Sequence, residues 1–185
     1  MNVQSKLPTT ADEFLRWNEG RQGKREFVKG RVVEMMINVT RLHQRLATRL
    51  VFQLESQLGT EDFEIGSADF GIRTSDGIRY PDAFVEKHSD DGKALATTTP
   101  LLIAEILSPS SMSDDFGSKA QDYLAIASLQ HYVVLSQDDA CLWLWTRRGG
   151  DWEGPVLYRD RAEPIFLPHL EISLDLAKLY AGIAA

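Results

Sequence analysis

The sequence has one cysteine, Cys141, among its 185 residues, so no internal disulfide forms. It also lacks an excess of positive charge, because 20 Lys and Arg stand against 27 Asp and Glu, a formal net charge of -7. That balance argues against a large basic surface that binds nucleic acid, although a local basic groove is still compatible with it. No apolar run has the length of a signal peptide or a transmembrane helix. These absences favour a soluble, cytoplasmic protein.

Signatures of two common enzyme classes are also missing. The sequence has four histidines, and their spacing does not suggest a zinc site. The serines at 108, 110 and 111 lack a Gly-x-Ser-x-Gly elbow, which argues against a serine hydrolase. Cys141 lies in the apolar string CLWLW, which is typical of a core thiol rather than a nucleophile.

Apolar periodicity predicts interleaved helices and strands. Leucine recurs at every fourth position from Leu42 to Leu58, which predicts an amphipathic helix from Arg41 that ends at Gly59. Gly30 divides two β-rich runs and predicts a hairpin. Other patterns predict helices over 10–18, 114–128 and 174–182, strands over 63–67, 70–74, 78–86, 101–107, 131–135 and 141–148, a hairpin-like segment over 149–158 and a loop over 87–100. We therefore expect one domain over 1–185, of α/β or α+β class with a mixed sheet.

Two carboxylates interrupt these apolar strand patterns. Glu105 lies in LLIAEIL, a run that is apolar on both faces, as in a central strand covered on both sides. Asp82 alternates with Ile78, Tyr80 and Phe84, which places these side chains on one face of a predicted strand. A carboxylate there is unfavourable unless it is paired or binds a metal. If the two strands pair, the carboxylates converge, and two hard oxygen ligands with water and a phosphate suit Mg²⁺.

A lysine follows on the next predicted helix. Lys119 lies one turn after Asp115 and one turn before Tyr123, so the three side chains share a helix face. A lysine beside a metal-bound water can orient the water, assist its deprotonation or neutralise a phosphoryl transition state. We expect Asp114 and Asp115 to be helix-start residues rather than metal ligands, and Tyr123 to pack near the site.

The ordered strings resemble a known family. REFVKGRVVEM, RLHQRLATRL, YPDAFV, AEILSPSS, DDFGSKAQDYLAI and QHYVVL follow one another in the order typical of the bacterial Uma-two family of putative restriction endonucleases, within the PD-(D/E)XK nuclease superfamily. The resemblance covers nearly the whole chain. It implies an α/β fold with a restriction-endonuclease-like core, a mixed β-sheet flanked by helices. It also implies an endonuclease that uses Mg²⁺ or Mn²⁺ to hydrolyse DNA phosphodiester bonds. Because a cut through both strands of a duplex needs two active sites, we also expect a homodimer.

The resemblance assigns roles to individual residues. Asp82 and Glu105 would bind the metal, with the backbone carbonyl of Ile106 as a third ligand. Glu26 matches an early acidic position and would be an additional metal or water ligand. His43 matches a helix histidine and would contact substrate phosphate or tune Glu26.

The catalytic lysine departs from the common superfamily motif. That motif places the lysine two residues after the acid, where this sequence has Leu107, which cannot serve. The family resemblance places the lysine on the next helix, at Lys119.

Three hypotheses follow from these observations. The first is the metal-dependent nuclease with Asp82, Glu105, Lys119 and Glu26 as catalytic residues. The second is a nuclease-fold protein that binds nucleic acid or a protein partner without cutting, which the negative net charge and Leu107 favour. The third is a structural dimerising protein in which Glu105 and Lys119 form a buried salt bridge.

Overall fold

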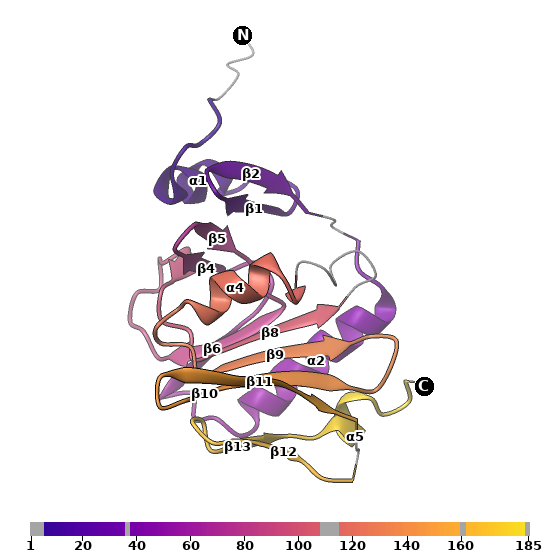
Figure 1. The fold of residues 1–185 in the computed structure, drawn as a ribbon. Coiled ribbons are helices and arrows are strands. Elements are labelled where there is room, and N and C mark those ends of the chain that lie inside the picture. The colour runs from indigo at the N-terminus through magenta and orange to yellow at the C-terminus, as the bar shows by residue number, and fades with distance from the viewer. Residues whose placement is uncertain (1–5, 36–37, 108–114, 160–161, 184–185) are drawn as a thin grey trace.

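The computed structural model describes residues 6–35, 38–107, 115–159 and 162–183. Most of its strands form two sheets (Figure 1). The six-stranded sheet has the order β11 (Asp151–Tyr158), β10 (Leu142–Arg148), β9 (His131–Ser136), β8 (Leu102–Leu107), β6 (Ala83–Lys87) and β3 (Phe63–Gly66). The five-stranded sheet has the order β2 (Arg31–Glu34), β1 (Arg25–Val28), β5 (Gly77–Arg79), β4 (Gly71–Thr74) and β7 (Ala96–Thr97).

The N-terminal elements follow the predicted patterns. Helix α1 (Ala11–Asn18) begins after Thr10, whose side chain accepts a hydrogen bond from the Glu13 amide. Strands β1 and β2 form the predicted hairpin around Lys29 and Gly30, which both have positive φ angles of 49° and 76°. Two consecutive left-handed residues are the conformation that a tight two-residue hairpin requires.

One predicted strand is wrong in a way that matters for the site. Residues 78–86 were expected to form one strand, but the chain divides there into β5 and β6, which belong to different sheets. Ile78 therefore packs in a cluster with Phe27, whereas Phe84 packs with Ile103. Pro81 lies in the break, where a residue without an N–H leaves no ladder bond unmade. Asp82 is thus placed at the passage between the two sheets.

Helices cover both faces of the six-stranded sheet. Ala104 of β8 packs in the cluster that contains Leu50 of α2 (Arg41–Glu55), whereas Ile103 packs with Tyr123 of α4 (Ser118–Leu124). Because successive side chains of a strand point to opposite faces, α2 and α4 lie on opposite sides of the sheet (Figure 1). Glu105 alternates with Ile103, so its side chain faces α4.

The central strand has the predicted environment. All six residues of β8 are buried, and the strand pairs with β6 on one edge and in parallel with β9 on the other. A mixed sheet with helices on both faces is the architecture that the sequence predicted. The α/β fold class is therefore confirmed.

Several boundaries differ from the sequence-based prediction. Helix α2 ends at Glu55 rather than Gly59, and α4 covers only part of 114–128. Asp114, which was expected at the start of that helix, lies outside the described residues. The expected loop over 87–100 contains β7, and the segment over 149–158 is one strand, β11, paired with β10. The chain closes with β12 (Ile165–Leu167), β13 (Ile172–Leu174) and α5 (Leu176–Leu179), a shorter helix than expected.

Candidate functional site

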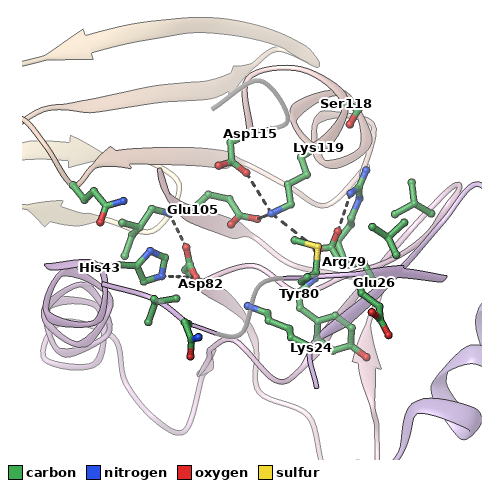
Figure 2. A pocket seen from close by; sticks show the side chains of 18 of the residues that line it. Lys24, Glu26, His43, Arg79, Tyr80, Asp82, Glu105, Asp115, Ser118 and Lys119 are labelled. Atoms are coloured by element: carbon green, nitrogen blue, oxygen red, sulfur yellow. Dashed lines mark hydrogen bonds and ion pairs between the residues drawn. The ribbon is translucent and has the colours of Figure 1, made fainter. Parts of the chain in front are cut away.

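A cavity of about 630 Å³ lies where the two sheets meet α2 and α4. Its walls come from chain segments that are far apart in the sequence (Figure 2). The cavity brings together every residue that the sequence singled out as a site residue: Glu26, His43, Asp82, Glu105, Ile106 and Lys119.

The pairing of β6 with β8 brings the two predicted metal carboxylates together. Ala83 pairs with Ala104, and Asp82 and Glu105 are the next residues beyond this pair on the two chain segments. The Ile106 backbone N–H donates a hydrogen bond of 2.8 Å to Asp82 Oδ2. Ile106 therefore holds Asp82 through its amide, whereas the resemblance gave a role to its carbonyl. The other predicted ligand, Glu105, is only 4% exposed.

Helix α2 supplies the second contact of Asp82. His43 lies in the first turn of α2, where its amide donates to the Thr40 side chain that caps the helix. The His43 Nε2 atom lies 3.0 Å from Asp82 Oδ1. His43 therefore orients Asp82, and the described residues show no contact between His43 and Glu26, which the resemblance had named as its partner. Its predicted contact with substrate phosphate stays a prediction.

The face of α4 that carries Lys119 closes over Glu105. Lys119 Nζ lies 3.1 Å from Glu105 Oε1 and 3.3 Å from Asp115 Oδ1. The Tyr123 hydroxyl donates a 3.0 Å hydrogen bond to the same oxygen of Glu105. Lys119 and Tyr123 share a face of α4 as predicted, whereas Asp115 lies before the start of α4 at Ser118 and contacts Lys119 from there. The sequence nevertheless underestimated Asp115, which it assigned to the helix start, and Tyr123, which it assigned to packing.

A second group of buried charges lies behind Lys119. Arg79 Nη1 donates to Glu26 Oε2 at 2.8 Å, and Arg79 Nη2 donates to Asp122 Oδ2 at 2.6 Å. Glu26 Oε1 accepts the Tyr80 amide at 3.2 Å and lies 4.0 Å from Lys119 Nζ. Arg79 thus joins β1, β5 and α4. Arg79 and Asp122 were not predicted from the sequence as site residues, although an arginine in an apolar strand pattern needs a partner as much as Glu105 does.

The site carries an excess of negative charge. The pKa of Glu105 is raised to about 8, chiefly by burial; the charge of Lys119 lowers it, and the carboxylates of Asp82, Asp115 and Glu26 raise it. Glu105 is therefore a carboxyl group that a nearby cation would favour in its ionised form.

The other ionisable groups respond to the same crowding. Burial raises the pKa of Asp82, but the hydrogen bonds from His43 and Ile106 and the charges of His43 and Lys24 lower it overall. Burial lowers the pKa of Lys119, yet the surrounding carboxylates raise it above the usual value. Lys119 is therefore held as a cation, suited to binding and orienting oxygen atoms rather than to accepting a proton.

The donor set fits a magnesium ion that keeps part of its hydration. Among the described residues, no group of three or more His, Cys, Asp or Glu side chains is arranged to hold a metal. Mg²⁺ commonly binds through one or two carboxylates and takes its remaining ligands from water and substrate phosphates. Asp82 and Glu105 supply two such carboxylates in a cavity with surplus negative charge.

Sequence comparison then places the chain in a family. A family model described as Putative restriction endonuclease, Uma2, matches residues 11–177. The chain belongs to the Uma2 family. The resemblance drawn from the ordered strings is thereby confirmed.

Two relatives and a solved structure are similar to this chain. The uncharacterized Synechocystis protein slr1290 is 28% identical over 177 residues, which cover 94% of this chain and 92% of the relative. The uncharacterized Synechocystis protein sll1609 is 33% identical over 133 residues, 69% of this chain and 75% of the relative. A crystal structure of a putative nuclease belonging to DUF820 from Anabaena variabilis superposes with a TM-score of 0.74 at 17% identity, covering 94% of this Uma2 chain and 98% of the other. The last comparison shows a shared fold.

No helix in the described part of this Uma2 protein is both long and apolar enough to cross a membrane.

Proposed function

We propose that this protein is a Mg²⁺-dependent endonuclease that hydrolyses phosphodiester bonds in DNA. The observation that carries the proposal is the convergence of Asp82, Glu105 and Lys119 on one cavity, with Asp82 held by the amide next to Glu105. The family description and the shared fold of a putative nuclease support it. Mn²⁺ is the expected substitute for Mg²⁺, because both favour oxygen ligands.

Each residue has a defined part in this proposal. Asp82 and Glu105 hold the metal, which when bound would polarise the phosphate and lower the pKa of a bound water. His43 and the Ile106 amide fix the Asp82 carboxylate. Lys119 stays charged, so it orients the attacking water and offsets negative charge that develops on the phosphate. Glu26, held by Arg79, restrains Lys119 from the other side.

A second function is favoured by the pairing of Lys119. Its amine contacts both Glu105 and Asp115, and Lys119 is only 5% exposed. A closed ion-pair cluster of this kind suits a protein that binds nucleic acid or a protein partner without cutting. The cavity beside the cluster separates this arrangement from the sealed salt bridge of a purely structural protein.

The test joins metal binding to cleavage. Mg²⁺ and Mn²⁺ are titrated by calorimetry into the wild type and into the Asp82→Asn, Glu105→Gln double variant, which keeps side-chain shape and removes both charges. Plasmid DNA is incubated with each protein and metal in parallel. The matched control is the Glu55→Gln, Asp90→Asn double variant, which changes two exposed carboxyl groups outside the cavity.

The outcomes separate the two functions. We expect saturable metal binding and metal-dependent cleavage in the wild type and control, and neither in the Asp82, Glu105 variant. Metal binding without cleavage of duplex or single-stranded DNA or RNA would favour the binding protein. No metal binding by the wild type would exclude the metal site. The predicted homodimer would give paired cuts in duplex DNA, and sedimentation of the same preparations measures its mass.

A further inference from the structure

Lys24 stands apart from the other cations of the candidate site. Three basic side chains line the 630 Å³ cavity: Lys24, Arg79 and Lys119. Arg79 is bonded to two carboxylates and Lys119 to two others. Within the described residues, the Lys24 side chain has no ion pair and no hydrogen bond. Lys24 is therefore the cation of this cavity that remains available for an anionic ligand.

The backbone of Lys24 is nevertheless fixed. Its carbonyl accepts the Met35 amide at 2.8 Å, which ties the start of β1 to the end of β2. Its side chain is half-buried, and Figure 2 shows the amine on the side toward Asp82. Lys24 is also close enough to act electrostatically on Asp82. A cation in this position lines the cavity on the side of Asp82.

Lys24 also lies where two cavities meet. A second cavity of about 730 Å³ shares Lys24, Val39, His43 and Asp82 with the first and continues along α2. The two cavities are therefore adjacent, and Lys24 and Asp82 lie at the boundary between them. An extended ligand that occupied both cavities would pass Asp82 and Lys24.

Lys24 lies in the most basic part of the sequence. Residues 1–50 carry 10 of the 20 Lys and Arg of the chain but only 5 of its 27 Asp and Glu. The neighbouring cations are engaged elsewhere: the guanidinium groups of Arg21 and Arg25 lie over the Trp17 ring, and Arg25 also pairs with Glu34. A polynucleotide strand carries one phosphate at each nucleotide, so a strand with one phosphate at the metal site places another beside it.

We propose that Lys24 is a substrate-binding residue that contacts a phosphate of the polynucleotide strand adjacent to the phosphate at Asp82 and Glu105, with the strand passing through both cavities. This inference rests on the proposed function. Lys24 determines which phosphate of the polynucleotide strand lies at Asp82 and Glu105, and it takes no part in bond cleavage.

The test compares two lysines of the same hairpin. Lys24→Gln removes the charge and keeps most of the side chain, and Lys24→Arg restores the charge. Lys29→Gln is the matched control, because Lys29 is exposed at the β1–β2 turn and lines neither cavity. The probe is a fluorescein-labelled single-stranded DNA of about 12 nucleotides. Its anisotropy is measured with Ca²⁺, which also takes oxygen ligands, at several salt concentrations.

The expected result is specific to a phosphate contact. Lys24→Gln weakens binding about tenfold, which corresponds to about 1.4 kcal/mol. The salt slope of the binding constant falls by roughly 0.7. Lys24→Arg restores binding, and Lys29→Gln stays within about twofold of the wild type. Calorimetry with Mg²⁺ gives Lys24→Gln a metal affinity no weaker than that of the wild type, because removing a positive charge beside Asp82 does not oppose cation binding. In cleavage assays Lys24→Gln raises KM more than it lowers kcat.

The two proposals fail in distinguishable ways. If the wild type cuts DNA and Lys24→Gln binds the probe with wild-type affinity and salt slope, the inference is overturned and the proposed function stands. If the wild type neither binds nor cuts nucleic acid, the proposed function falls and the inference with it. Thermal unfolding checks the fold of each variant, and Lys24→Ala replaces Lys24→Gln if that protein does not fold.

Discussion

Lys119 Nζ lies 3.1 Å from Glu105 Oε1, and the pair joins helix α4 to the central strand β8. Both groups are buried, and Tyr123 donates to the same carboxylate oxygen. Ion pairs of this kind give little net stability, because desolvation offsets much of the attraction. The pair instead determines where a charged amine lies relative to the two carboxylates proposed to hold the metal.

Replacing Glu105 should separate stability from metal binding. We expect Glu105→Gln to keep the free energy of unfolding in EDTA within about 1 kcal/mol of the wild type, since the amide oxygen still accepts from Lys119 and Tyr123. The same variant should lose Mg²⁺ binding and the thermal stabilisation that Mg²⁺ gives. Urea unfolding with and without Mg²⁺ measures both effects. A loss of several kcal/mol in EDTA would show that the charge of Glu105 is structural.

Replacing Lys119 should have the opposite effect. Lys119→Met leaves Glu105, Asp115 and Glu26 without their shared cation, and we expect a loss of about 3 kcal/mol in EDTA. Because Mg²⁺ would then supply the missing positive charge, it should stabilise this variant more than it stabilises the wild type. Urea unfolding measures the difference, and Lys87→Met, at an exposed position, is the control. Equal stabilisation of both proteins by Mg²⁺ would argue against a metal beside Lys119.

Arg79 and Arg73 allow a buried arginine ion pair to be compared with a partly exposed one. Arg79→Lys should lower the free energy of unfolding by about 2 kcal/mol, because an ammonium cannot reproduce the planar contacts with Glu26 and Asp122. Arg73→Lys, in a partly exposed pair with Asp12, should change it by about 0.5 kcal/mol or less. Urea midpoints of the two variants test the comparison, and similar losses at both positions would contradict it.

A buried histidine away from the site should control acid stability. Burial, with a smaller contribution from His169, lowers the pKa of His131 to about 4 from its ordinary value of 6.5. Between pH 6.5 and 4, His131 therefore binds a proton in the unfolded chain but stays neutral in the folded chain. Stability from this group is complete above pH 6.5 and is lost as the pH falls toward 4, by about 3 kcal/mol in total.

The measurement is the difference between two pH profiles. His131→Phe should lose less stability than the wild type between pH 6.5 and 4, whatever its stability at pH 7. His88→Gln, at an exposed position, is the control and should follow the wild type. Parallel profiles for His131→Phe and the wild type would show that His131 titrates normally in the folded protein.

Local sequence patterns predicted the helices and strands whose apolar side chains recur at regular spacing and form the core. The leucines of α2 recur at helical spacing, and three of them, Leu46, Leu50 and Leu54, are fully buried. The apolar run around Glu105 predicted a central strand, and this prediction holds because both faces of β8 are covered. The carboxylates of Asp82 and Glu105 were identifiable for the same reason, since a charge in such a run needs a partner.

The remaining features depend on contacts between distant segments. Arg79 meets Glu26 and Asp122 across separations of 53 and 43 residues, and no periodicity within one element encodes those contacts. The division between β5 and β6 is likewise set by the sheets that each strand joins, although Pro81 marks the place. His43 lies in α2, and the fold determines that its side chain contacts Asp82.

Leu107 occupies the position where the common superfamily motif has a lysine, and this difference affects how such proteins can be recognised. Leu107 is buried with Ala120 and Tyr123 under α4, so the strand position that usually carries the amine contributes to the core. Lys119 brings the amine to Glu105 from the helix instead. A motif search that requires the acid and the lysine on one strand would pass over this chain. A search for the spatial arrangement of the carboxylate and the amine, regardless of chain order, would find it.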